Sequence, residues 1–354
     1  MQVGEIYHGF RLIEETQIEE ISSLARLFEH KKTKARLIHL ENDDENRMFL
    51  IGFRTPPDDD TGIPHIIEHS VFCGSRKFPC KEPFVELLKG SLHTFINAMT
   101  SADVTIYPVA TKNEKDFFNL MDVYLDAVFY PAIYKRKEIF QQEAWHYHIE
   151  SIDDEIIFKG VVYNEMKGAY SSPEAIIGDL STRALFPDTT YGLDSGGSPD
   201  KIPELSYKQF LDFHKKHYHP SNSYMILYGQ GNLQDRLKFI HEQYLDEFSY
   251  KEIDSAIHYQ APFKRVKEVT EYYPILTDEE MKNKTYFCYS MVVETHENPL
   301  TNLGLSILLN ILVDSEAAPL RQAILNARLG TDVYSCSETH KQHVWGLVVK
   351  NSNA

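Results

Sequence analysis

Cysteine is scarce in this chain, with four residues in 354 positions, and long apolar runs are missing. Four scattered cysteines in a chain of this length do not form the dense disulfide framework of a small secreted domain, so they indicate a reducing compartment. No uninterrupted apolar run approaches the length of a helix that spans a bilayer. The opening MQVGEIYHGFRLIEE lacks the pattern of a signal peptide or a transit peptide. We therefore expect a soluble, cytoplasmic protein with no membrane partner, and an organellar location stays open if the N-terminus is processed.

Basic side chains are outnumbered, because 36 Lys and Arg stand against 52 Asp and Glu and give a formal net charge of −16. That sign opposes contact with a phosphate backbone, so no nucleic acid is expected as a partner. An acidic interior surface would attract basic peptides, but net charge alone does not show where the acids lie. Apolar residues make up 42% of the chain, which is enough for well-filled cores, and the length favours about two domains.

The order of apolar patterns predicts an α+β fold. Strand-like segments come first, helical periodicities follow, and a late strand returns, which is typical of helices gathered on one face of a mostly antiparallel sheet. Expected strands cover 35–42, 47–55 and 221–230, expected helices cover 64–72, 114–129, 135–150 and 158–170, and a β-hairpin joins 91–98 to 103–110.

The segment order of the first part returns near the end of the chain. Residues 305–350 run helix, short helix, glycine, strand, turn and strand, as residues 65–110 do, and Gly330 takes the place of Gly90. Leucines stand where the first copy has histidines, so the second copy is expected to be non-catalytic. We predict two related domains, each a sheet with helices on one face: an N-terminal catalytic domain over 1–250, a linker over 251–263 and an incomplete homologous domain over 264–354.

The stretch GIPHIIEHSVFCGS, residues 62–75, carries the strongest chemical signal. His65 and His69 are four residues apart, so on a helix their imidazoles lie one turn apart on one face and can reach one tetrahedral ion. Glu68 lies on nearly the same face, where a carboxylate can take a proton from water at the open position of a metal. The order His-x-x-Glu-His is the reverse of the common zinc-peptidase helix.

A catalytic zinc usually has three protein ligands, so a third must come from elsewhere in the chain. Glu165 in VVYNEMKGAY and Glu143 in IFQQEAWHYH are the candidates. A carboxylate within an apolar helix needs a partner, and a divalent cation is a strong one. Spacing alone does not choose between the two glutamates.

Together with PCKEPFVELLKGSLHTFINAMTSADVTIYPV, FKGVVYNEMKGAYSSPE and HYHPSNSYMILYG, this motif resembles the pitrilysin/insulinase family of zinc metallopeptidases, which are inverzincins. Within that family it is most similar to the branch of presequence protease and falcilysin. The resemblance covers nearly the whole chain and corresponds to the N-terminal portion of such a protein. It implies a processing-peptidase-like metallohydrolase fold and one Zn²⁺ per chain.

The resemblance also implies roles for individual residues. His65, His69 and Glu165 match the zinc ligands, and Glu68 matches the general base that activates a zinc-bound water. Glu143 lies on a helix that contributes a further acidic residue beside the site, so it is expected to orient an imidazole or the zinc water rather than bind the metal.

The strand SLHTFINAMT resembles the edge strand along which such enzymes bind substrate by β-augmentation. Asn97 and Ala98 are expected to flank the scissile bond, with Asn97 offering its amide to the substrate backbone. The alternative is an ordinary strand of the sheet.

The function implied is that of a zinc-dependent endopeptidase that degrades short, unstructured peptides, as a presequence protease does. Members of the family enclose the site in a chamber made by two halves. The expected partners are therefore peptide substrates and a C-terminal half, which is either part of the same polypeptide or a partner subunit. Two alternatives stay open: a non-catalytic or inactive subunit of such a peptidase, and a small-molecule metallohydrolase on a related fold.

Overall fold

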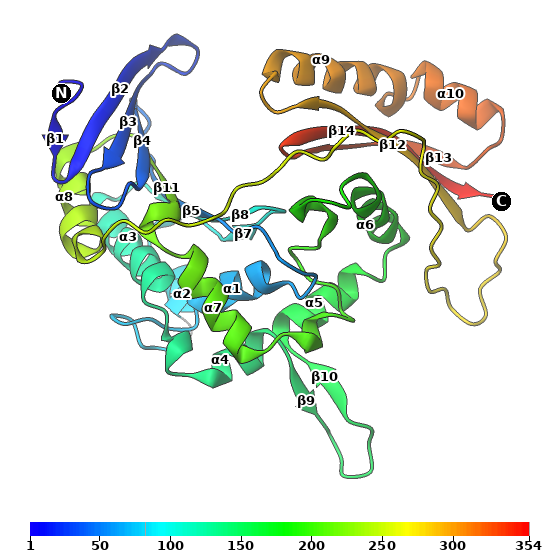
Figure 1. The fold of residues 1–354 in the computed structure, drawn as a ribbon, viewed down its shortest axis with the longest axis horizontal. Coiled ribbons are helices and arrows are strands. Elements are labelled where there is room, and N and C mark those ends of the chain that lie inside the picture. Colours follow the sequence, from blue (N-terminus) through cyan, green and yellow to red (C-terminus); the bar gives the residue numbers. More distant parts are fainter. Residues whose placement is uncertain (82, 354) are drawn as a thin grey trace. The chain divides into compact units, whose positions relative to one another are not determined.

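A computed structural model gives the fold and describes residues 1–81 and 83–353 (Figure 1). The chain forms two compact units, of which the first contains Met1–Asn164 and Ser195–Ser255 and the second contains Glu165–Asp194 and Ala256–Ala354. This division differs from the predicted one in the segment 165–194, because helix α6 lies against a strand of the C-terminal sheet. The domain boundaries at 250 and 264 stay a prediction.

The first unit is built on a sheet of nine strands, and the predicted α+β class is confirmed. The strands lie in the order β1-β2-β3-β4-β11-β5-β8-β6, with β7 also paired to β8. Every pair is antiparallel except that of β11 with β4. The strands are β1 Ile6–Tyr7, β2 Phe10–Ile18, β3 Ser23–His30, β4 Arg36–Glu41, β5 Arg47–Arg54, β6 His93–Ile96, β7 Met99–Thr100, β8 Val104–Thr111 and β11 Ser223–Tyr228.

Helices pack on one face of this sheet, as Figure 1 shows for α1, α3 and α7. In α3, Asn113 caps the first turn by accepting a hydrogen bond from the Asp116 backbone N–H, and Phe117 and Tyr124 are fully buried toward β5 and β8. Each such aromatic side chain contributes about 1.5–3 kcal/mol by leaving water. The helices are α1 Ile63–Val71, α2 Pro83–Gly90, α3 Glu114–Phe129, α4 Lys137–Glu143, α7 Tyr207–His217 and α8 Leu233–Gln243.

The helix predicted over 135–150 is wrong in its second half. Helix α4 ends at Glu143, and His146–His148 form strand β9, which pairs with β10 (Ile157–Lys159) in a separate hairpin. Tyr147 and Phe158 face each other across it with ring centroids 5.3 Å apart, and Trp145 packs on both rings. This cross-strand aromatic packing outweighs the helical periodicity of the segment. The helix predicted over 158–170 begins only at Val161, where α5 (Val161–Ala169) follows the hairpin.

The second unit repeats the topology of the first on a smaller scale. Its three strands lie in the order β12-β14-β13, all antiparallel, just as β5, β8 and β6 do. Both sets run strand, helices, strand and strand along the chain, so the predicted relation between the two domains has a structural counterpart. The elements are α6 Pro173–Leu185, β12 Thr285–Thr295, α9 Pro299–Leu309, a π-helical turn Asn310–Asp314, α10 Pro319–Asn326, β13 Asp332–Thr339 and β14 Gln342–Ser352.

By length and composition alone, the stretch Pro299–Asn326 is apolar enough to cross a membrane. In the fold it is not one helix, because α9 has 11 residues, the π-helical turn adds 5, and α10 starts only at Pro319. A bilayer crossing takes about 20 helical residues. Leu309 of α9 and Val313 of the π-helical turn are buried against Val333 and Leu347 of the sheet, whereas Leu300, Leu303 and Ile307 of α9 are exposed, so α9 covers the sheet with one face only.

Candidate active site

The helix that carries the histidine motif starts at a contact between two glycines. Gly62 caps α1 with a φ of 67°, in the left-handed region, and a Cβ on it would lie 2.5 Å from the Gly196 carbonyl oxygen. Gly197 has a φ of 101°, and a Cβ on it would lie 2.8 Å from the Gly62 Cα, while the Ser198 backbone N–H donates to the Asp60 carbonyl at 2.9 Å. The backbone contact fixes where α1 begins and therefore where its first histidine lies.

His65 and His69 lie on the same side of α1, with ring centroids 4.9 Å apart and planes at 80°. Both are half-buried, whereas Ile66, Ile67 and Val71 are fully buried and hold the opposite face in the core. The His65 Nδ1 lies 3.2 Å from the Gly196 carbonyl oxygen. Since a carbonyl oxygen only accepts, this Nδ1 carries the proton and Nε2 keeps its lone pair for a ligand.

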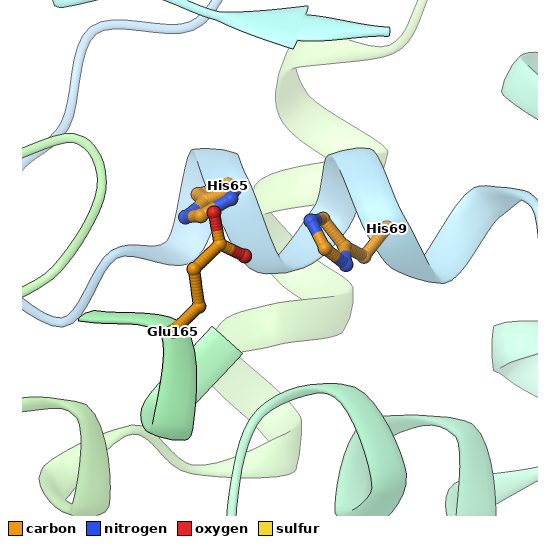
Figure 2. Close-up of side chains that lie close together, drawn as sticks. All are labelled: His65, His69 and Glu165. Carbon is orange, nitrogen blue, oxygen red and sulfur yellow. The ribbon is translucent and has the colours of Figure 1, made fainter. Parts of the chain in front are cut away.

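Glu165 brings a carboxylate to the two imidazoles. One ligand atom from each of His65, His69 and Glu165 lies within 4.8 Å of the others, and Figure 2 shows the Glu165 side chain pointing from α5 toward α1. The first turn of α5 belongs to the first unit, and Glu165 continues that helix. The sequence predicted that Glu165 would lie among apolar residues of a buried helix. In the structure Glu165 is exposed, and Val162 is the residue of α5 that is buried. Two nitrogen donors and one carboxylate suit Zn²⁺.

Glu143 lies beside one of these histidines. Its Oε2 is 3.4 Å from the His69 Nδ1, and its Oε1 accepts hydrogen bonds from Gln142 Nε2 at 2.8 Å and Cys73 Sγ at 3.4 Å. Burial alone would raise the pKa of Glu143, but the hydrogen bonds from His69, Gln142 and Cys73 outweigh it and lower the pKa below its ordinary value. The carboxylate therefore stays ionised and holds the His69 Nδ1 proton, so that Nε2 carries the lone pair of the ring.

Glu68 is a buried carboxylate on the same helix, with 8% of its surface exposed. Among the described residues it has no hydrogen-bond or ion-pair partner. The neighbouring hydroxyls of Tyr107 and Tyr218 lie 2.8 Å apart, and burial followed by the charges of their neighbours, Glu68 included, raises the pKa of Tyr107. Both phenols thus stay neutral, and the Glu68 oxygens are acceptors open to a water molecule.

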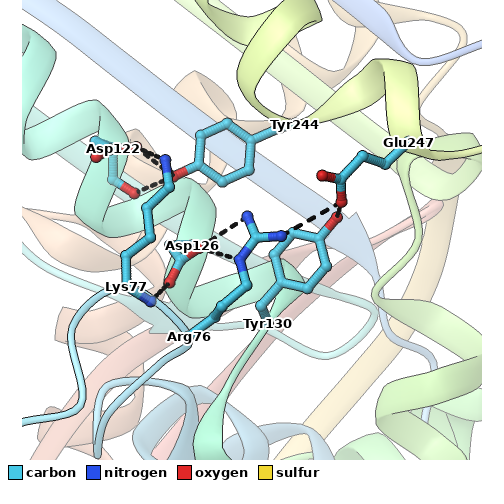
Figure 3. A network of polar contacts seen from close by, with 7 residues as sticks. All are labelled: Arg76, Lys77, Asp122, Asp126, Tyr130, Tyr244 and Glu247. Atoms are coloured by element: carbon cyan, nitrogen blue, oxygen red, sulfur yellow. Dashed lines mark hydrogen bonds and ion pairs between the residues drawn. The ribbon is translucent and has the colours of Figure 1, made fainter.

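The loop after α1 is anchored by a network of charged and phenolic side chains (Figure 3). Asp126 of α3, which is fully buried, accepts from the Lys77 backbone N–H at 2.6 Å and from the Arg76 guanidinium at 3.2 Å. Arg76 also lies 3.6 Å above the Tyr130 ring. Both ends of α1 are thereby fixed, which limits the movement of its two imidazoles.

The strand expected to bind substrate lies at the edge of the nine-stranded sheet, and it is interrupted where the sequence predicted its functional residues. Strand β6 ends at Ile96 and β7 begins at Met99, so Asn97 and Ala98 lie in the break. The Asn97 Oδ1 accepts from the Ala98 backbone N–H at 2.9 Å, and the Asn97 carbonyl accepts from the Tyr124 hydroxyl at 3.2 Å. Asn97 is exposed, and its side-chain NH₂ group is a hydrogen-bond donor.

Sequence reasoning missed several residues around the histidines. Gly196 and Gly197 lie more than a hundred residues from the motif, and only the GG pair in DSGGSPD hints at a close backbone contact. Cys73 and Gln142 each neighbour a candidate residue in the sequence, but nothing in their spacing signals that they meet at Glu143.

Two family models match the chain. The model described as Insulinase (Peptidase family M16) matches residues 48–177, which contain α1, the edge strand and Glu165. The model described as Peptidase M16 inactive domain matches residues 204–354. Together they cover most of both units.

Relatives in other organisms agree with this match. The chain is 53% identical to Protein HypA of Clostridium perfringens over 99% of its own length and 36% of that protein, and 48% identical to presequence protease 1 of Arabidopsis thaliana over 92% and 30%. It thus spans about a third of the length of these relatives. The fold matches pitrilysin with a TM-score of 0.65, over 97% of this chain and 35% of that one, at 15% identity. The chain therefore belongs to the insulinase/pitrilysin family of peptidases.

Proposed function

We propose that the chain carries the catalytic centre of a zinc-dependent endopeptidase that degrades short, unstructured peptides. The observation that supports it most strongly is the convergence of ligand atoms from His65, His69 and Glu165 within 4.8 Å of one another. The names of the presequence protease relatives suggest peptides as the substrate class.

The residues present fit one zinc ion. The proton on the His65 Nδ1 is held by a backbone carbonyl and that on the His69 Nδ1 by the Glu143 carboxylate, so both Nε2 atoms can bind metal together with a Glu165 oxygen. Three protein ligands leave a coordination position open, as in catalytic zinc sites. When bound, zinc would polarise the scissile carbonyl and acidify water.

The side chains of this chain then have distinct tasks. Glu68 accepts the proton of the attacking water and passes it to the leaving amine. Glu143 keeps the His69 ring in one orientation. The peptide adds a strand to the open edge at β6, and the side-chain NH₂ of Asn97, next to Ala98, donates to its backbone near the scissile bond.

Two further parts of the proposal concern the whole protein. Because the relatives are about three times as long as this chain, we expect a further half, in the same polypeptide or in a partner subunit, to complete the chamber. The four free thiols suit the reducing cytoplasm. The match of residues 204–354 to a domain described as inactive supports a non-catalytic role for the second unit.

Metal analysis and peptide cleavage test the proposal on three proteins. The wild-type chain should contain one zinc, His69→Ala should lose most of it, and Glu68→Gln should keep it. In the complete protein, Glu68→Gln should lower turnover of a quenched unstructured peptide by at least about a hundred-fold, because an amide cannot accept the water proton.

Three outcomes would count against the assignment. A one-to-one zinc content in His69→Ala would refute the ligand set. Near-normal turnover in Glu68→Gln would exclude it as the base. Loss of zinc from Glu68→Gln would make this residue a ligand instead.

A further inference from the structure

Two of the four cysteines meet in the second unit, and neither belongs to the proposed catalytic residues. Cys288 on β12 and Cys336 on β13 flank the central strand β14, and their Sγ atoms lie 3.9 Å apart. Gly346 of β14 lies opposite Cys336, and a Cβ on it would be 2.7 Å from the Cys336 Sγ. The missing side chain leaves room for the two thiols to meet across β14.

These two thiols are poorly placed for a disulfide. Their strands are separated by a third strand, so ordinary strand spacing puts the two backbones about 9.5 Å apart. A disulfide needs Cα atoms within about 7 Å of each other. Forming one would require β12 and β13 to close over β14, which fills the space between them. The pair is therefore a dithiol held at a fixed separation.

We propose that Cys288 and Cys336 form a two-thiolate binding site for a soft divalent cation, Zn²⁺ or Cd²⁺. An ion between sulfurs 3.9 Å apart can bond to both at about 2.3 Å, with an S–metal–S angle of roughly 115°, close to the tetrahedral angle that zinc prefers. Water, together with the hydroxyls of Ser181 and Ser290, which lie 2.7 Å apart beside Cys288, completes the coordination.

The surroundings favour one thiolate in advance of the metal. The hydrogen bond from Cys336 lowers the pKa of Cys288 despite its burial, and the Ser181 and Ser290 hydroxyls add to that effect. The same hydrogen bond, then burial and the charge of Glu338, raise the pKa of Cys336. Cation binding therefore displaces the Cys336 proton, together with that of any Cys288 still protonated: M²⁺ bonds to both sulfurs as thiolates, and at least one H⁺ leaves.

Cadmium is the probe that tests the site, because a sulfur-to-cadmium charge-transfer band reports thiolate ligands and not imidazoles or carboxylates. In a Cys73→Ser/Cys80→Ser background, Cd²⁺ should produce this band with an end point of one ion per chain and release between one and two protons. Cys288→Ser and Cys336→Ser, each added to that background, should weaken binding at least about ten-fold, and Zn²⁺ should compete.

One further variant distinguishes cadmium binding at the two cysteines from binding at the proposed catalytic site. His69→Ala in the same background should leave the band unchanged, so a failure of either site does not hide the state of the other. X-ray absorption at the cadmium edge counts the sulfur neighbours without any change at Cys288 or Cys336, and two are expected. Absence of the band, one sulfur or none, or a band that survives Cys288→Ser would overturn the proposal, as would rapid formation of a Cys288–Cys336 disulfide under mild oxidation.

Discussion

Two glutamates beside the histidines differ in what surrounds them, and that difference is testable. Glu165 is exposed and lies with the imidazoles, whereas Glu143 is buried and bonds to the Nδ1 of His69. We expect Glu165→Gln to weaken zinc binding more than Glu143→Gln, because removing a charged ligand costs more than loosening a ring that the helix still holds. Zinc competition with a chromophoric chelator measures both affinities.

The expected loss for Glu143→Gln is about 10–100-fold in zinc affinity, the usual effect of removing the partner of a metal-bound histidine. Gln142→Ala is the matched control, since its side chain donates to the Oε1 of Glu143, whereas the Oε2 is the oxygen near His69. If Glu143→Gln lost more zinc than Glu165→Gln, the two residues would exchange roles.

His214 predicts a loss of stability in acid. Its Nδ1 accepts from the Tyr134 hydroxyl at 2.8 Å and its Nε2 donates to the Val128 carbonyl at 3.0 Å, and burial lowers its pKa to about 4. In the unfolded chain the His214 imidazole has a pKa of about 6.5. Below that pH the unfolded chain binds a proton at His214 and the folded chain does not, so the free energy of unfolding decreases as the pH falls toward 4. By pH 5 this one residue should cost about 2 kcal/mol.

Urea unfolding at pH 7 and pH 5 measures this loss, with Trp145 as the reporter in a Trp345→Phe background. His214→Gln keeps a donor and an acceptor without a titrating ring, so the difference between the two pH values should shrink by about 2 kcal/mol. Replacement of the exposed His258 should leave the difference as it is. An unchanged difference in His214→Gln would contradict the buried, neutral imidazole.

The sequence predicted part of this site and not the rest, for a physical reason. His65, Glu68 and His69 lie within one helical segment, so a local pattern places them together without a tertiary structure. Glu143 and Glu165 depend on how α4 and α5 pack, and their spacing alone left the choice open. The partners of the Nδ1 atoms depend on the tertiary structure. The Gly196 partner is a backbone carbonyl in a loop, so no pattern of side chains predicts it.

At the scale of elements, α1 depends on the glycine contact at its start. Gly62→Ala places a Cβ 2.5 Å from the Gly196 carbonyl oxygen and forces a left-handed φ on an L-residue. The left-handed conformation alone costs about 1–2 kcal/mol, and the overlap adds to it. We expect the first unit to lose at least about 2 kcal/mol of unfolding free energy, measured by urea unfolding, and zinc affinity to fall with it.

Gly90→Ala is the matched control for that experiment. Gly90 ends α2, and nothing lies within 4 Å of a Cβ built on it, so this substitution should change stability little. Equal stability of Gly62→Ala and Gly90→Ala would show that the loop at Gly196 yields freely and does not fix α1.

Elements with one strong local pattern were predictable, and those that depend on remote partners were not. The helix predicted over 114–129 is found as Glu114–Phe129, where a capping asparagine and an unbroken apolar face agree. The end of α4 was not predicted. It depends on the packing of Trp145 and Tyr147 against Phe158 across a hairpin, and the periodicity of the local sequence does not indicate that contact.

At the scale of the whole molecule, the third of the family's length that this chain spans should bind zinc and yet be a poor catalyst. Donors that stabilise a developing oxyanion contribute about 10²–10³ in rate, and an open site also loses substrate positioning. We expect residues 1–354 alone to cleave an unstructured peptide of about twenty residues at least about a hundred-fold more slowly than the same residues together with the proposed further half, supplied in one polypeptide or as a partner subunit. Steady-state turnover with equal zinc content measures the ratio, and comparable rates would show that this chain is a sufficient catalyst.

The position of β11 sets the order in which the first unit can be completed during synthesis. Strands β4 and β5 follow each other in the chain but do not pair, because β11 lies between them and bonds to both. At ordinary translation rates of about 5–20 residues per second, roughly 10–35 s pass between the synthesis of Arg54 and that of Tyr228. During that interval β4 and β5 each present an unpaired edge. The nascent chain should therefore need protection by chaperones until Tyr228 has left the ribosome, and a ribosome stalled before Ser223 should hold a chain that proteases cut readily.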